Sequence, residues 1–264
     1  MMRTIQNGDK SMSEEIELRL LRENEELKRR LNILEGKSED IIPTYSFSKI
    51  TINDLKKCVN IKRSYEEIAF NDWFNYKNEL DIDDIVFLEK LLAKYGKFIK
   101  SYKEETLKAN FIIPIINQVD FLSIEFETSP FYEEVISYET DKFIFNGETD
   151  FVISRGLEYS EKPYFFIQEF KKGKVSTDPE PQLLAELISA VELNNWNIIK
   201  GAYIVGSIWN FVILEKLGKD KYQYFVSDNF DSSKIEDLKS IYKNLVFIKN
   251  EIIEKIKEES KSGE

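Results

Sequence analysis

The chain of 264 residues contains no histidine and a single cysteine, Cys58. The absence of histidine excludes serine–histidine triads, histidine-ligated zinc sites and histidine general bases. One cysteine cannot form an intramolecular disulfide or a cysteine-rich zinc site, and without a histidine partner we expect Cys58 to be an incidental or buried thiol. Any catalytic centre must therefore use carboxylates, lysine, tyrosine, the lone thiol or a bound metal.

Long apolar runs are also missing. No stretch approaches the length of a membrane span, and the polar N-terminus MMRTIQNGDKSMSEE lacks the apolar core of a signal peptide. We therefore expect a soluble cytoplasmic protein with no membrane partner. A net charge of −11 argues against a generally basic surface, so nucleic-acid binding would need a local patch. With 42% hydrophobic and 13% aromatic residues, most of the chain can still bury a sizeable core.

The N-terminal part is rich in charge. We expect residues 1–13 to be disordered and residues 14–36, which lack proline and have their only glycine at the end, to form a coiled-coil helix. The seam alternates steps of four and three and consists of Leu20, Asn24, Leu27, Leu31 and Leu34. Asn24 falls at a core position, where one buried polar residue favours an in-register pair. The sequence thus predicts a homodimer through residues 14–35; the alternative is a solitary amphipathic helix on the globular part.

The remainder is expected to form a helical region over 45–100 and an α/β domain over 101–258. Apolar residues recur every three or four positions through most of the first, with Asn53 or Asp81 as helix caps. In the second, a helix over 104–121, bent or ended near Pro114, precedes β-rich sequence. The expected strands are 123–128, 133–139, 142–147, 149–154, 164–172, a strand pair within 201–216, and 221–227. We expect a mixed sheet flanked by helices, with Asn146-Gly147 as a turn.

The helices expected after these first strands follow from cap signals and periodicity. Asp178-Pro179 is a good cap and first-turn pair for a helix over 183–194, and apolar spacing predicts a last helix over 233–259.

One strand, in the sequence FFIQEFKKGK, ends in charged residues. Its expected faces are Phe165, Ile167, Glu169 and Lys171 on one side, and Phe166, Gln168 and Phe170 on the other. Asp150 opens another apolar strand, and if the two strands are neighbours, Asp150 and Glu169 converge at one sheet edge beside Lys171. Two carboxylates provide hard oxygen ligands for Mg²⁺ or Mn²⁺.

In this order the residues resemble the PD-(D/E)xK nuclease superfamily. Its signature is an acidic residue at a strand start, here Asp150, followed on the next strand by Glu-x-Lys, here Glu169-Phe170-Lys171. The proline that names the family is replaced by Thr149.

Two flanking helices extend the resemblance, which covers about residues 100–217. EETLKANFIIP is similar to a helix motif in the N-terminal nuclease domain of type I restriction enzyme motor subunits, and places Glu104, or its neighbour Glu105, as an accessory acidic residue. Gln182, near the start of PQLLAELISA, matches a glutamine that many members carry.

The resemblance implies a restriction-endonuclease-like core and Mg²⁺- or Mn²⁺-dependent hydrolysis of phosphodiester bonds, most readily of DNA. The implied metal ligands are Asp150, Glu169, Glu104 and the backbone carbonyl of Phe170. The implied catalytic residues are Asp150, Glu169, Lys171 and Gln182. Lys171 would position the attacking water and stabilise negative charge, and Gln182 would orient Lys171 or contact the phosphate backbone.

Two alternatives stay open at the level of sequence. One is a non-catalytic interaction module that keeps a nuclease-like fold and dimerises through its N-terminal coiled coil. The other is a nuclease that acts on RNA or on branched DNA, because nothing in residues 45–100 reads as a base-recognition motif.

Overall fold

The computed structural model describes residues 27, 31, 42–77, 79–171 and 178–262. The chain divides into two compact units, Met1–Pro43 and Thr44–Glu264, and the fold described below is that of the second. The expected disordered N-terminus lies outside the described residues. So does the expected coiled coil, apart from Leu27 and Leu31, which are both exposed. Dimerisation through this segment stays a prediction.

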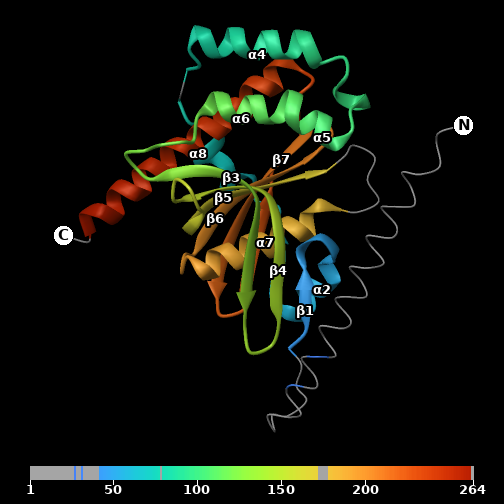
Figure 1. Cartoon of the computed structure of the whole chain (residues 1–264), viewed down its shortest axis with the longest axis vertical. Helices are drawn as coiled ribbons and strands as arrows, with labels where there is room; N and C mark the ends of the chain where they lie inside the picture. Colours follow the sequence, from blue (N-terminus) through green and yellow to red (C-terminus); the bar gives the residue numbers. More distant parts are fainter. Residues whose placement is uncertain (1–26, 28–30, 32–41, 78, 172–177, 263–264) are drawn as a thin grey trace, which may run out of the picture. The chain divides into compact units, whose positions relative to one another are not determined.

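A single mixed sheet forms the centre of the Thr44–Glu264 unit (Figure 1). Its strands are β1 (Thr44–Ser46), β2 (Asn60–Ser64), β3 (Thr128–Glu139), β4 (Ile144–Arg155), β5 (Glu161–Lys171), β6 (Ile198–Val205), β7 (Ile208–Gly218), β8 (Lys221–Val226) and β9 (Phe230–Asp231). Their order is β1-β4-β5-β6-β7-β8-β2, with β3 paired to β4 and β9 to β7. The pairs β1/β4, β5/β6 and β8/β2 are parallel and the others antiparallel. The predicted mixed α/β architecture is confirmed at this level.

Helices cover both faces of the sheet (Figure 1). They are α2 (Ile52–Cys58), α3 (Asn71–Phe74), α4 (Ile82–Tyr95), α5 (Glu104–Leu107), α6 (Ile113–Val119), α7 (Pro179–Leu193) and α8 (Ile235–Ser262). Short 3₁₀ turns occur at Phe47–Lys49, Glu67–Phe70 and Ile99–Ser101, and a π-helical turn at Lys108–Ile112. One buried cluster joins α3, α4, α6 and α8 to one sheet face; a second joins α2 and α7 to the other.

The predicted helical region 45–100 also supplies two strands of the sheet. α2 and α4 are present, and the Asp81 side chain caps α4 by accepting a hydrogen bond from the Asp84 amide at 2.8 Å. However, β1 and β2 pair in parallel with β4 and β8, so the expectation of helix is wrong for these two segments. Tertiary pairing overrides the weak local preference of sequences such as NIKRS.

The long strands β3 and β4 correct three details of the prediction. Residues 123–128 form a turn closed by the Ser123–Thr128 bridge, whereas the two strands expected over 142–147 and 149–154 are one continuous strand that begins at Ile144. Asn146 and Gly147 therefore lie within β4 and do not form a turn. Gly147 is required there for another reason: an added Cβ would lie 3.0 Å from Cδ2 of Phe47, which packs against the sheet.

The helical segment after residue 104 was expected to bend or end near Pro114, and it changes geometry just before this residue. α5 passes into the π-helical turn and then into α6, in whose first turn Pro114 lies. Because proline has no amide hydrogen to donate to the preceding turn, the regular α-helical ladder is interrupted, and the wider turn precedes this point.

The expected elements after β5 are present. Asp178 caps α7 by accepting a hydrogen bond from the Glu180 amide at 3.0 Å, and the last helix is α8. The strand pair expected within 201–216 is present as the antiparallel hairpin of β6 and β7.

Candidate active site

The end of β5 carries Glu169 and Lys171, with side chains 1% and 22% exposed. The Lys171 ammonium donates to Oε1 of Glu169. The strand alternates as predicted from Phe166 onward, with Phe166 and Phe170 in the cluster of α4, α6 and α8. Phe165 departs from the pattern and joins the same cluster, because the register with β4 shifts at this point and leaves Phe165 as a bulge residue.

Asp150 lies in the middle of β4, not at its start, and it meets the end of β5. β4 and β5 are antiparallel with Phe151 opposite Gln168. Oδ2 of Asp150 accepts a hydrogen bond of 2.8 Å from the backbone amide of Phe170, between Glu169 and Lys171 in sequence. The expected convergence of Asp150 with the Glu-x-Lys segment is therefore observed. The proposed role of the Phe170 carbonyl as a ligand stays a prediction.

Lys108, from the π-helical turn, connects the preceding helix to this site. Its ammonium lies 2.8 Å from Oδ1 of Asp150 and 3.5 Å from a carboxylate oxygen of both Glu104 and Glu105. Glu104 is 34% exposed and Glu105 83%, so Glu104 is the more closely held of the two. Sequence reasoning missed Lys108, although the spacing of four residues from Glu104 was a signal that both occupy one helix face.

Helix α7 contributes two buried polar residues, Gln182 and Glu186. Nε2 of Gln182 donates to Oε1 of Glu186 at 3.1 Å. The described contact of the Gln182 amide is thus with Glu186, and its suggested contact with Lys171 stays a prediction. Glu186, which is fully buried, was missed by sequence reasoning. The available signal was a second polar residue four positions after Gln182 within the apolar sequence LLAELISA.

Burial dominates the electrostatics of the two glutamates. Burial, then the nearby carboxylates of Glu186 and Asp150, raise the pKa of Glu169 well above its ordinary value despite the ion pair with Lys171. Burial also raises the pKa of Glu186, against the hydrogen bond from Gln182. For Lys171, burial alone would lower the pKa, but the Glu169 carboxylate more than offsets it and the pKa is raised. Without a bound cation, these directions favour the protonated form of both glutamates and the charged form of Lys171.

Two oxygens of this cluster are unsatisfied. Oε2 of Glu169 and Oε2 of Glu186 are buried and have no hydrogen-bond partner within the part of the chain that the structure describes. A buried carboxylate oxygen without a partner carries a substantial desolvation cost. Both atoms are therefore candidates for binding a group from outside the chain.

The donor atoms fit a hard divalent cation, since Asp150, Glu169 and Glu186 offer only oxygen. Their present positions are those of a site neutralised by lysine, with the ammonium groups of Lys108 and Lys171 on two of the three carboxylates. Among the described residues, no group of three or more acidic or cysteine side chains is arranged so that it could hold a metal ion. Cation binding would thus require these ammonium contacts to rearrange.

Comparisons with known proteins add no family: no protein-family model matches the sequence, and no curated protein is significantly similar to it. No helix in the described ranges is long and apolar enough to cross a membrane. The best indication of function is therefore the geometry of the cluster formed by Asp150, Glu169 and Glu186.

Proposed function

We propose that this protein is a divalent-cation-dependent nuclease with a restriction-endonuclease-like core, which hydrolyses phosphodiester bonds of DNA. The observation that carries the proposal is the pair of buried carboxylate oxygens on Glu169 and Glu186 that have no partner among the described residues, close to Asp150 and Lys171 at the end of β5. The order of these residues along the chain, and their resemblance to the PD-(D/E)xK signature, give the reaction class.

The site holds an excess of buried negative charge. Three carboxylates, Asp150, Glu169 and Glu186, gather around the nearly buried end of β5, and two lysines offset them only in part. Such an arrangement destabilises a fold by several kcal/mol unless protons or cations neutralise it. A function that needs a cation explains why the cluster exists.

Each residue has a role in this proposal. Asp150, Glu169 and Glu186 would hold Mg²⁺ or Mn²⁺, which when bound supplies Lewis-acid polarisation of the phosphate and a more acidic water. Lys171, at the solvent side of Glu169, would orient the attacking water and stabilise charge on the phosphate oxygens. Lys108 fixes Asp150, and Gln182 fixes Glu186.

The test is cleavage of labelled DNA by the full chain with Mg²⁺ or Mn²⁺, and with chelator. Asp150→Asn and Lys171→Met should each lower the rate about 100-fold or more, since each removes an interaction with the reacting groups. The matched control is Lys90→Gln, an exposed substitution on α4 over the opposite sheet face, which should cleave like wild type.

Equal cleavage by the wild type, Asp150→Asn and Lys171→Met would contradict the assignment of Asp150 and Lys171 to the active site. Absence of cleavage in a folded wild type that also fails to bind Mn²⁺ would instead favour a non-catalytic module.

A further inference from the structure

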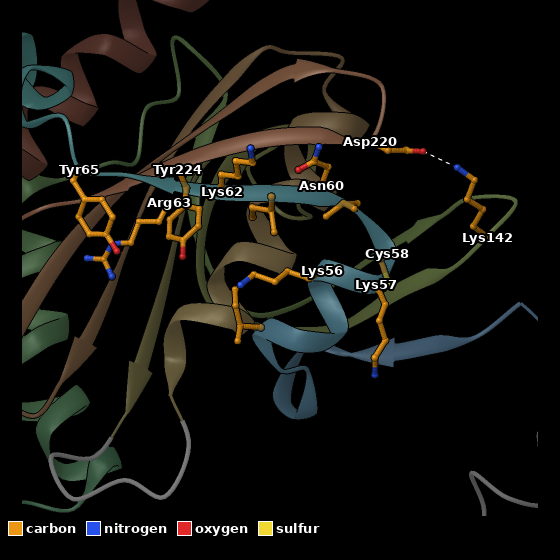
Figure 2. Close-up of a pocket in the computed structure, with 13 residues that line it drawn as sticks. Lys56, Lys57, Cys58, Asn60, Lys62, Arg63, Tyr65, Lys142, Asp220 and Tyr224 are labelled. Carbon is orange, nitrogen blue, oxygen red and sulfur yellow. Dashed lines mark hydrogen bonds and ion pairs between the residues drawn. The ribbon is translucent and has the colours of Figure 1, made fainter.

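A basic groove lies away from the carboxylate cluster, between α2, the edge strand β2 and its neighbour β8 (Figure 2). Its volume is about 1020 Å³. The basic side chains that line it are Lys56, Lys57, Lys62, Arg63 and Lys142, and the one acidic lining residue is Asp220. We call this feature the basic groove.

The charge of the basic groove is opposite to that of the whole chain, which carries −11. Lys142 is paired with Asp220, and Lys57 with Asp54, each at 2.8 Å. Lys56 and Lys62 are exposed and make no ion pair with any residue in the described ranges. These two lysines, which the described part of the chain does not neutralise, are available to an anionic ligand.

An aromatic side chain stands at one end of the same groove. Tyr65 is 83% exposed, and the guanidinium carbon of Arg63 lies 5.3 Å from its ring centre. Figure 2 shows Tyr65, Arg63 and Tyr224 gathered at this end, with Lys56 extending towards them from α2. An exposed ring beside cationic groups is the combination with which proteins bind single-stranded nucleic acid, where bases stack and phosphates pair with lysine and arginine.

The basic groove leads to the start of α7, the helix that carries Gln182 and Glu186. Arg63 lies 3.4 Å from Glu180 in the first turn of α7, and the Tyr224 hydroxyl donates to the same carboxylate at 2.8 Å. Six residues of helix separate Glu180 from Glu186, a rise of about 9 Å. A polymer lying in the groove could therefore continue to the carboxylate cluster.

The sheet supports the same connection. Tyr203 on β6 is opposite Glu169 in the β5/β6 register, and Tyr224 on β8 is opposite Arg63 on β2. Burial raises the pKa of both Tyr203 and Tyr224. The charge of Glu180 raises the pKa of Tyr203 further, and the hydrogen bond to Glu180 raises that of Tyr224. Glu180 at the start of α7 thus connects Arg63 and Tyr224 in the basic groove with Tyr203, the strand neighbour of Glu169.

We propose that the basic groove binds a single-stranded nucleic acid and guides it to the carboxylate cluster, so that the substrate is an unpaired strand or a duplex end with an unpaired tail. Lys56, Lys62 and Arg63 would contact phosphates, and Tyr65 would stack on a base. Stacking on Tyr65 requires a free base face, which a continuous duplex does not offer. That the basic groove guides a substrate to the carboxylate cluster rests on the proposed nuclease function, whereas binding of a single strand in the groove does not.

The test is binding of a fluorescein-labelled single strand of mixed sequence to the full chain, measured by anisotropy in chelator so that no cleavage occurs. The double substitution Lys56→Gln/Lys62→Gln should weaken binding and reduce the slope of log K against log salt by about 1.4, or about 0.7 for each lost contact. Tyr65→Ala should weaken binding about fivefold or more and leave that slope unchanged.

Lys90→Gln on α4, which removes one exposed charge over the opposite sheet face, should bind like wild type. Asp150→Asn should also bind like wild type while losing cleavage. If binding responds to the groove substitutions but no metal condition gives cleavage, the basic groove is supported as a binding site and the proposed nuclease function is wrong.

Three results would overturn the groove proposal. The first is that the groove variants, verified as folded by thermal melting, bind and cleave like wild type. The second is that a duplex of the same length binds as tightly as the single strand, with no effect of Tyr65→Ala. The third is that poly-glutamate displaces the strand as well as unlabelled DNA does, which would identify an acidic protein partner.

Discussion

At the residue scale, the central feature is a glutamate pair held under conditions that disfavour its charge. Glu169 and Glu186 are both fully buried, and each has one oxygen bonded and one without a partner in the described part of the chain. A purely structural role for such a pair is unfavourable, because apolar residues of the same size would fill the space with a smaller loss of folding free energy. The arrangement is better explained by binding than by stability.

The raised pKa of Glu186 leads to a prediction for the cation-free protein. Folding raises the pKa, so the folded chain retains protons that the unfolded chain releases; the stabilisation is complete below the ordinary carboxyl value and is lost as the pH rises above it. Between about pH 5 and about pH 8, the free energy of unfolding of the wild type should fall by up to about 1.4 kcal/mol per pH unit for each such group. Glu186→Gln should flatten this dependence in denaturant titrations with chelator.

The control is Glu148→Gln, the same substitution at an exposed position on β4, which should keep the pH dependence of the wild type. A wild type and Glu186→Gln with parallel pH profiles would show that Glu186 does not hold a proton in the folded state.

The sequence predicted most of this cluster but not all of it. Asp150, Glu169 and Lys171 were found because strand alternation and motif order both indicated them. Glu186 and Lys108 were not, since each depends on how a helix is placed against the sheet. A carboxylate in an apolar helix can be found from sequence, but only the packed structure shows that it faces Glu169 and not solvent.

At the element scale, helix α7 packs against β6 at Gly201, where there is no room for a side chain. A Cβ there would lie 2.8 Å from the carbonyl oxygen of Ile167 and 3.0 Å from Cδ2 of Leu187. Ile167 precedes Glu169 by two positions, and Leu187 follows Glu186 directly. The same close approach therefore brings the two glutamates together.

We accordingly predict that Gly201→Ala destabilises the protein. The added methyl group must move α7 or β5, at a cost of about 1–3 kcal/mol. For a unit of this size, that corresponds to a decrease in melting temperature of about 2–4 °C per kcal/mol, measurable by calorimetry.

Gly218→Ala is the matched control, because an added Cβ at this position on β7 meets no atom within 4 Å. Identical melting temperatures for the two variants would contradict the close packing of α7 on β6.

The secondary structure could be predicted where the apolar periodicity was clear or a capping residue was present. It could not be predicted where a segment becomes a strand only by pairing with a distant strand. α4, α7 and α8 follow from apolar spacing and the Asp81 and Asp178 caps. β2 could not be expected from NIKRS, since it becomes a strand only by pairing with β8. Asn146-Gly147 reads locally as a turn, but the need to accommodate Phe47 explains the glycine.

At the scale of the whole molecule, the distribution of charge matters more than its sum. A net charge of −11 would repel nucleic acid from most of the surface. The basic groove and the carboxylate cluster provide opposite charges at the two ends of a path along the start of α7. An acidic chain can therefore bind a polyanion at one defined place.

The central claim is that Asp150, Glu169 and Glu186 together bind a divalent cation. The most direct measurement is an anomalous difference map from crystals soaked in Mn²⁺, recorded near the manganese absorption edge. We predict one strong peak in contact with the carboxylates of Asp150 and Glu169, with the Lys171 ammonium displaced from Glu169. A map with no peak at the end of β5, at a Mn²⁺ concentration that saturates sites elsewhere on the protein, would contradict the claim.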